Sequence, residues 1–65
     1  MRNGTYSLEA EAIYESPDAV LVLDDNGEEV WVPQSQIHDD SEVWRRGDEG
    51  TLVVTDWFAK KAGWL

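Results

Sequence analysis

A chain of 65 residues is long enough for one small domain, and its 14 Asp and Glu residues against five Lys and Arg residues give a formal net charge of −9. The absence of cysteine excludes disulfides and thiol chemistry, and a single histidine argues against a structural zinc site. No apolar run approaches the roughly 20 residues of a membrane span, and the N-terminal residues lack an apolar signal region. We therefore expect a cytoplasmic protein with no membrane partner and no cofactor.

The charge is concentrated in the first two thirds of the chain. Eleven of the 14 acids lie within residues 1–44, where Arg2 is the only base, whereas residues 45–65 carry four bases and three acids. An acidic surface repels phosphate, so a nucleic-acid partner is not expected. Such a surface attracts a basic protein, mimics the charge of nucleic acid, or only keeps a small protein soluble. The sequence leaves these three explanations of the acidity open.

The first half of the chain predicts three strands. Residues 5–15 alternate polar and apolar side chains, which is typical of a half-buried strand. Residues 19–23 are apolar on both faces and predict a central strand covered on each side. After an Asn-Gly hairpin turn at 26–27, residues 28–32 return as a strand that Pro33 ends or marks as an edge. The inner face of the first strand is predicted to hold Tyr6, Leu8, Ala10, Ala12 and Tyr14.

The second half of the chain predicts shorter elements. Residues 34–36 are expected to form a turn or a short 3₁₀ segment, followed by Ile37 as an apolar plug. Residues 41–45 predict a short strand, residues 47–50 a loop, and residues 51–54 the last strand.

A short helix is predicted at the C-terminus, with Asp56 in its first turn and residues 57–62 helical in composition. Thr55 is its expected N-cap, because a threonine hydroxyl can accept a hydrogen bond from a backbone N–H of the first turn. Gly63 is expected to end the helix in the left-handed conformation. Trp64 is then expected to fold back onto Ala59.

Together these elements predict a mainly β fold, a small SH3-like or OB-like barrel of four or five short antiparallel strands with a short C-terminal helix. The barrel is expected to occupy residues 1–65 as a single domain. Because the strands are few and short, one sheet edge is expected to stay exposed. An exposed edge offers a route to self-association or to the capture of a partner strand.

Two segments resemble small uncharacterised proteins of bacteriophages and prophages. The segments are AVLVLDDNGEEVWVPQSQI (residues 19–37) and, after an acidic spacer, GTLVVTDWFAKKAGWL (residues 50–65). The family carries a "W-hydrophobic-P-x-S-Q" segment and a C-terminal "W-hydrophobic-A" helix, matched by Trp31, Pro33, Ser35, Gln36 and the run Trp57-Phe58-Ala59. The resemblance implies a phage-like origin in the host-cell cytoplasm and brings no catalytic residue. Gln34 stands where relatives often have a base, which weakens a nucleic-acid function, and Phe58 stands where leucine is usual.

No residue set predicts catalysis or a metal site. Three acidic pairs suggest calcium, but alignment of the turn glycine with the EF-hand glycine puts Val22 and Pro33 at the first and last ligand positions. His38 precedes two aspartates, and a general base of this kind would need a nucleophile such as Ser35 or Ser41. No nucleophile elbow accompanies either serine. We therefore expect no enzyme activity and no metal.

Trp31 is the residue that most directly suggests a binding surface. With Val30 and Val32 facing the core, Trp31 points to the opposite face of the sheet. An exposed tryptophan is a hot-spot candidate, and whether the C-terminal helix covers this one stays open. The candidate partner-binding residues are Trp31, Trp44, Gln34, Gln36, Glu28 and Glu29.

Three functional hypotheses follow. The first is a non-catalytic protein-interaction module that self-associates through an edge strand or a tryptophan surface. The second is an acidic phage counter-defence protein that blocks a nucleic-acid-binding host enzyme, using Glu9, Glu11, Asp24, Asp25, Glu28, Glu29, Asp39 and Asp40. The third is a single-stranded nucleic-acid binder that combines aromatic rings with Arg45, Arg46, Lys60 and Lys61. We expect the first hypothesis to hold.

Overall fold

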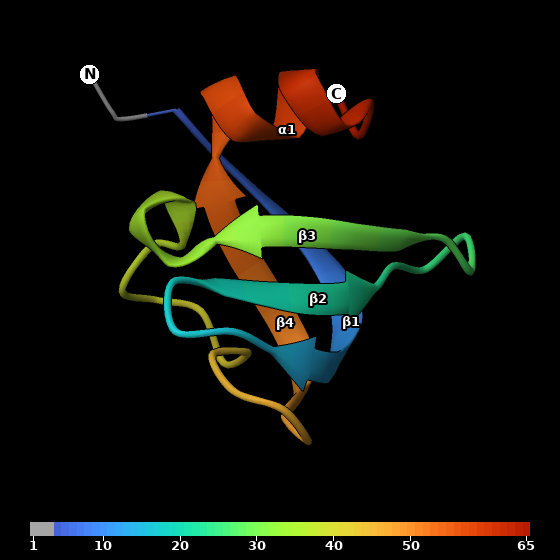
Figure 1. Cartoon of the computed structure of the whole chain (residues 1–65). Helices are drawn as coiled ribbons and strands as arrows, with labels where there is room; N and C mark the ends of the chain where they lie inside the picture. Colours follow the sequence, from blue (N-terminus) through green and yellow to red (C-terminus); the bar gives the residue numbers. More distant parts are fainter. Residues whose placement is uncertain (1–3) are drawn as a thin grey trace.

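The computed structural model describes residues 4–65 as a four-stranded antiparallel sheet followed by one short helix (Figure 1). The order of the strands in the sheet is β3-β2-β1-β4. The elements in chain order are β1 (Thr5–Glu15), β2 (Ala19–Leu23), β3 (Glu29–Pro33), the 3₁₀ turn η1 (Gln34–Gln36), β4 (Glu49–Thr55) and α1 (Asp56–Ala62). The predicted mainly β fold with a short C-terminal helix is confirmed.

The long strand β1 belongs to both halves of the sheet. Its residues 5–11 pair with β4, and its residues 11–15 pair with β2. The pairing register with β2 shifts between Ala12 and Tyr14, so β1 carries a bulge there. Bulges bend a strand and increase its twist. As a result β2 and β3 lie across β1 and β4, as Figure 1 shows.

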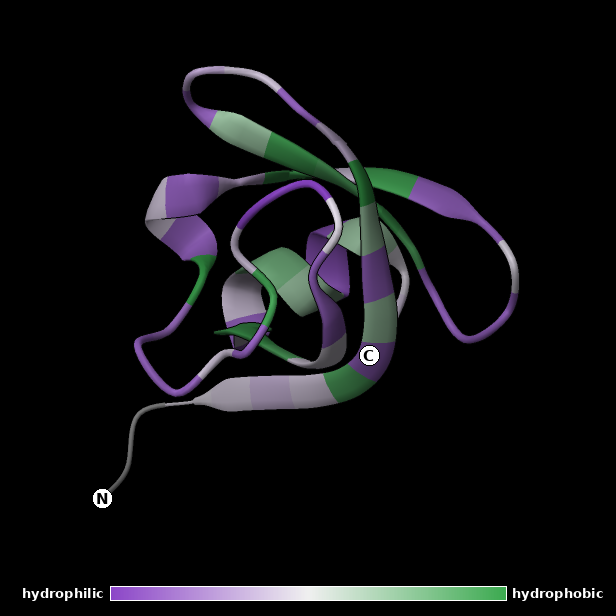
Figure 2. Cartoon of the chain, turned by 90° about the horizontal axis from the view of Figure 1, so that it is seen from below, coloured by the Kyte–Doolittle hydropathy of each residue, from purple (hydrophilic) through white to green (hydrophobic). Residues whose placement is uncertain are grey.

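The core lies between these two halves of the sheet. Polar and apolar residues alternate along the first part of β1, as Figure 2 shows, and the apolar ones face inward. The fully buried side chains of the core include Val20, Val22, Val32, Val43, Leu52 and Val54. Ile37 is buried after η1, as predicted. The prediction that both faces of β2 are covered is wrong, because Leu21 and Leu23 on its outer face are only half-buried.

The sheet does not close into the SH3-like or OB-like barrel that the sequence predicts. Within residues 4–65, β3 and β4 are the two edges, and no ladder joins them. The chain after η1 meets β4 through an isolated bridge between Ile37 and Val54, and the N–H groups of His38 and Glu42 donate to β4 carbonyls at 2.8 Å without forming a ladder. The barrel stays open because the next residues leave the extended conformation.

The strand predicted over residues 41–45 is wrong. The Ser41 hydroxyl accepts the Val43 N–H at 3.1 Å and donates to the Val43 carbonyl at 3.2 Å. The Trp44 N–H donates to the Asp48 carboxylate at 2.9 Å. Side chains therefore satisfy the backbone groups that a ladder would have used.

Strand β4 starts earlier than the sequence predicts. Glu49 and Gly50, expected in a loop over residues 47–50, pair with β1. Gly50 has a φ of 145°, and a Cβ atom there would lie 2.6 Å from Oε1 of Glu42. That oxygen accepts the Thr51 N–H at 3.0 Å. The φ of Gly50 is strained for any other residue, so glycine is favoured where the strand begins beside Glu42.

The C-terminal helix forms as predicted. The Thr55 hydroxyl accepts the Phe58 N–H at 3.2 Å and caps the first turn. Gly63 ends the helix with a φ of 84°. The Trp64 N–H then donates to the Ala59 carbonyl at 2.8 Å, which confirms the expected fold-back.

A buried carboxylate connects this C-terminus to the β2–β3 turn. Oδ1 of Asp24 accepts the N–H groups of Asn26 and Glu28, both at 2.9 Å. Oδ2 of Asp24 accepts the indole N–H of Trp64 at 3.0 Å. The hydrogen bond from Glu28, followed by that from Trp64, holds the pKa of Asp24 below its ordinary value although burial opposes the shift. This charged group therefore fixes the turn and the C-terminus together.

Replacement of Asp24 by Asn tests the importance of this carboxylate. The amide keeps one oxygen for the turn but presents an NH₂ group to the indole N–H of Trp64. We expect the Asp24→Asn variant to lose about 1.5–3 kcal/mol of unfolding free energy, the range for hydrogen bonds to a charged group. Urea unfolding at pH 7 measures it. The control is Asp25→Asn, which removes the same charge from an exposed neighbour and should stay within about 0.5 kcal/mol of wild type. Equal stability of the two variants would contradict the proposed role.

The pKa of Asp24 also predicts how stability depends on pH. A carboxyl group whose pKa is lower in the folded state binds fewer protons there than in the unfolded chain. Its contribution is therefore complete above the unfolded pKa of about 3.9 and is lost as the pH falls through the lower folded value. We expect the stability difference between wild type and Asp24→Asn to shrink below about pH 4. Unfolding curves between pH 2.5 and 6 measure it, and a constant difference would refute the prediction.

Candidate functional site

Three apolar side chains form a row across the outer face of β1, β2 and β3. Tyr14 pairs with Leu21, and Leu21 pairs with Trp31, so the three residues lie in one line across the strands. The rings of Tyr14 and Trp31 meet edge to face, with centroids 6.2 Å apart and an interplanar angle of 83°. We call Tyr14, Leu21 and Trp31 the outer aromatic row.

The outer aromatic row is open to solvent. Tyr14 is 54% exposed and Trp31 is 48% exposed. On the inner side of β3, Val32 is buried and Val30 packs against the core, as predicted. The C-terminal helix therefore leaves Trp31 about half exposed. Adjacent exposed aromatic rings are the kind of surface that protein partners use.

Tyr14 lies on the outer face, so its predicted place on the inner face is wrong, and Leu21 is a member of the row that was not predicted. Strict alternation along β1 puts Tyr14 inside with Leu8 and Ala12, but the bulge after Ala12 reverses the alternation. The sequence carries a signal of this change, because Ile13 interrupts the polar side of the pattern. Two apolar residues in succession could have indicated the bulge.

The two predicted glutamates occupy different positions. Glu29 is exposed and pairs with Leu23, next to the row on the outer face of β3. Glu28 belongs to the turn, where its N–H donates to Asp24 and its carbonyl accepts the Asp24 N–H at 2.9 Å. Only Glu29 therefore adjoins the outer aromatic row.

The two predicted glutamines lie after the row rather than within it. Oε1 of Gln36 accepts the Thr55 hydroxyl at 2.6 Å, which ties η1 to the N-cap of α1. The backbone N–H of Gln34 donates to the Asp18 carbonyl at 3.0 Å. Gln36 is thus engaged in holding the fold.

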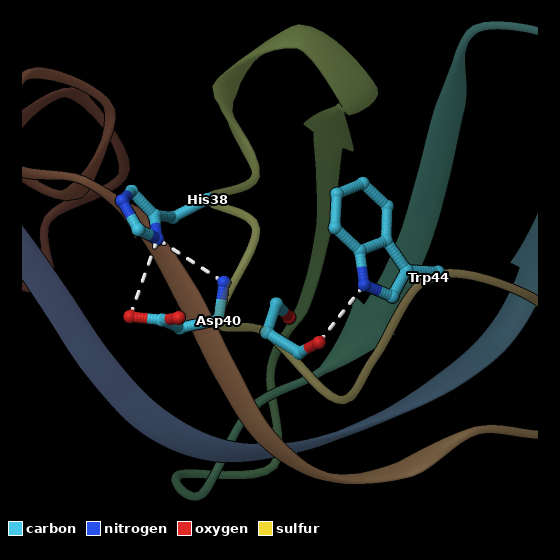
Figure 3. A network of polar contacts seen from close by, with 4 residues as sticks. His38, Asp40 and Trp44 are labelled. Carbon is cyan, nitrogen blue, oxygen red and sulfur yellow. Dashed lines mark hydrogen bonds and ion pairs between the residues drawn. The ribbon is translucent and has the colours of Figure 1, made fainter.

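Trp44 is held by residues 41–48, which form no strand or helix, and is not part of the outer aromatic row. Its indole N–H donates to the Ser41 carbonyl at 2.9 Å, and its half-buried ring packs against the core (Figure 3). The backbone N–H groups of Trp44 and Arg45 both donate to Oδ2 of Asp48, and they lower the pKa of the Asp48 carboxyl. Trp44 therefore holds its own segment against the core.

His38 lies beside Asp40, and Figure 3 shows both contacts between them. Nδ1 of His38 accepts the Asp40 N–H at 3.1 Å and lies 3.6 Å from Oδ2 of Asp40. The first contact needs an Nδ1 without hydrogen and the second an Nδ1 that carries one, so one form of the imidazole cannot make both. The Ser41 hydroxyl is buried and bonded to Val43. These residues therefore fit a local turn.

Several carboxylates surround an open hollow of about 210 Å³. It is lined by Glu9, Ala10, Glu11, Leu23, Asp24, Asp25 and Glu49. Four of the eight carboxylates of the counter-defence hypothesis thus gather here, whereas Asp39 and Asp40 lie in the segment after Ile37. Asp24 is buried and already bonded. No group of three metal-binding side chains occurs within the described part of the chain. The counter-defence hypothesis stays a prediction.

The four basic residues of the nucleic-acid hypothesis do not form one surface. Arg45 and Arg46 lie in the loop before β4, where the Arg46 N–H donates to Oε1 of Glu15 at 2.7 Å. Lys60 and Lys61 lie on α1, at the opposite end of the molecule (Figure 1). The Lys61 ammonium lies 5.6 Å from the ring centroid of Trp57. The pairs of bases are thus separated by the length of the sheet.

Comparison with known proteins adds no constraint. No family model, no curated protein and no solved structure matches the chain. Within residues 4–65, no helix is long and apolar enough to cross a membrane. The outer aromatic row is therefore the candidate functional site on the evidence of its own geometry.

Proposed function

We propose that this chain is a non-catalytic protein-interaction module that self-associates, with the outer aromatic row as the contact surface. The observation that carries the proposal is the exposure of two aromatic rings that already contact each other across Leu21. Tyr and Trp supply large contact areas at low cost in conformational entropy. A second copy that covers the row would remove both rings from water.

The outer face is better suited to a second copy than the edge of the sheet is. In Figure 1, α1 lies beyond the side of β3 that faces away from β2. Two copies that paired β3 with β3 would each bring an α1 helix toward the sheet of the other copy. The outer aromatic row has no such obstacle, because it lies on the face of the sheet opposite the core.

The phage-like origin is a further proposal that rests on residues 19–37 and 50–65. Within these segments the structure explains Gln36, which bonds Thr55, and Phe58, which is buried in the core. Trp31 is half exposed. The segments therefore combine residues that hold the fold with a residue available for contact.

The Trp31→Ala variant tests the proposed contact surface. We expect it to raise the dissociation constant of the self-associated form at least about 30-fold, as for a hot-spot tryptophan. Light scattering behind size exclusion measures the mass, at protein concentrations up to about 1 mM so that weak association is detected. Trp57→Ala is the matched control, since Trp57 is 60% exposed on α1 and outside the row. A wild-type monomer, or equal effects of the two variants, would overturn the proposal; far-UV circular dichroism checks folding.

The net charge predicts how association responds to salt. Two copies of charge −9 repel each other, and screening shortens this repulsion from about 30 Å at 0.01 M to about 8 Å at 0.15 M salt. We expect self-association to strengthen with salt, and Glu29→Gln, which removes the charge beside the row, to reduce this dependence. Asp40→Asn is the control, because it removes an equal charge away from the row. Association that weakens with salt would instead indicate ion pairs in the contact.

A further inference from the structure

We infer that the open edge of β3 binds an extended, basic segment of another protein as an added antiparallel strand. The added strand would bind the backbone of β3 rather than the outer face of the sheet. A monomer could bind this strand as well as a self-associated form could.

The register of the β2–β3 hairpin fixes which backbone groups of β3 face away from β2. The Asp24 N–H donates to the Glu28 carbonyl at 2.9 Å, and the Gln34 N–H donates to the Asp18 carbonyl at 3.0 Å. Hydrogen-bonded pairs alternate along an antiparallel ladder, so even-numbered residues of β3 bond to β2. The N–H and C=O groups of Glu29 and Trp31 therefore point outward.

These outward groups have no backbone or side-chain partner within residues 4–65. The other edge of the sheet is different. Along β4, the Val53 carbonyl accepts the His38 N–H and the Thr51 carbonyl accepts the Glu42 N–H, both at 2.8 Å. The chain thus covers the β4 edge and leaves the β3 edge available. A row of unpaired backbone groups is a template for an added strand.

Pro33 limits the length of the added strand. It has no N–H, so beyond Trp31 the edge offers only the Pro33 carbonyl. The site therefore offers two N–H groups and three carbonyls over the five residues of β3. It suits a segment of about five residues, since strands rise about 3.4 Å per residue and pair one to one.

The charge and the surroundings of the edge select the occupant. Asp25, Glu28 and Glu29 are exposed at the turn end of β3, and the chain carries a net charge of −9. Trp64 bonds Asp24 near the start of β3, and α1 lies beyond the open side (Figure 1). A single strand fits beside them more readily than a folded domain. The residue opposite Trp31 shares the outer face with its ring and should be apolar, and the residue opposite Glu29, two positions later, should be basic.

The acetylated, amidated peptide Lys-Thr-Val-Thr-Lys is a probe with this pattern. In an antiparallel register its valine lies opposite Trp31 and its second lysine opposite Glu29. We expect chemical-shift changes of the ¹⁵N-labelled protein to be largest at the amides of Glu29 and Trp31. Glu29→Gln should weaken binding, whereas Asp40→Asn, which removes an equal charge elsewhere, should weaken it less.

Two methylated peptides separate strand addition from simple attraction between charges. N-methylation of the valine removes the N–H that would donate to the Trp31 carbonyl, and should weaken binding at least about fivefold. N-methylation of the threonine that follows removes an N–H that points away from β3, and should change binding less than about twofold. Equal effects of the two peptides, shifts centred on the acidic hollow, or no binding at low salt would each overturn the inference. A monomeric chain that discriminates between the peptides would refute self-association and leave this inference intact.

Discussion

The carboxylate of Asp24 joins the β2–β3 turn to the C-terminal residues. It holds the turn that sets the β2–β3 register, and it holds the indole of Trp64, whose ring contacts Phe58 edge to face with centroids 5.8 Å apart. Phe58 belongs to the core, so the carboxylate links the hairpin to the core through the C-terminus. A buried charge is tolerated because three N–H donors satisfy it. The turn that leads into β3 is therefore tied to the core through this contact.

The bulge in β1 determines what the sheet shows to solvent. One extra residue after Ala12 turns Tyr14 outward, where it meets Trp31 across Leu21. The backbone of Ala12, next to the bulge, also binds the loop before β4. The Ala12 N–H donates to the Asp48 carbonyl and the Gly47 N–H donates to the Ala12 carbonyl, both at 2.8 Å. The bend that lets the two halves of the sheet enclose a core thus also creates the outer aromatic row.

Features that depend on neighbouring residues were predictable from the sequence, and features that depend on distant partners were not. The Thr55 cap and the Gly63 terminus are local, and both formed as predicted. The β2–β3 turn also formed, but it is centred on Asp25 and Asn26, and of the Asn-Gly pair only Gly27 has a positive φ. The strand over residues 41–45 failed because Asp48 and Ser41 side chains take its backbone groups. Among the candidate site residues, Trp31 is exposed and Glu29 adjoins it. Gln36 and Trp44 instead form hydrogen bonds within the fold, and the sequence pattern does not identify their bonding partners.

A chain of 65 residues has too little material to cover every surface of a four-stranded sheet. Here the segment after Ile37 covers the β4 edge and contributes Val43 to the core, and α1 contributes Phe58 and Ala59. None of the described residues covers the outer aromatic row or pairs with the open edge of β3. Trp31 lies where these two uncovered surfaces meet, because its side chain stands on the outer face and its backbone groups line the edge. A partner on either surface would therefore contact the same residue, which makes Trp31 the point at which binding at one surface can affect the other.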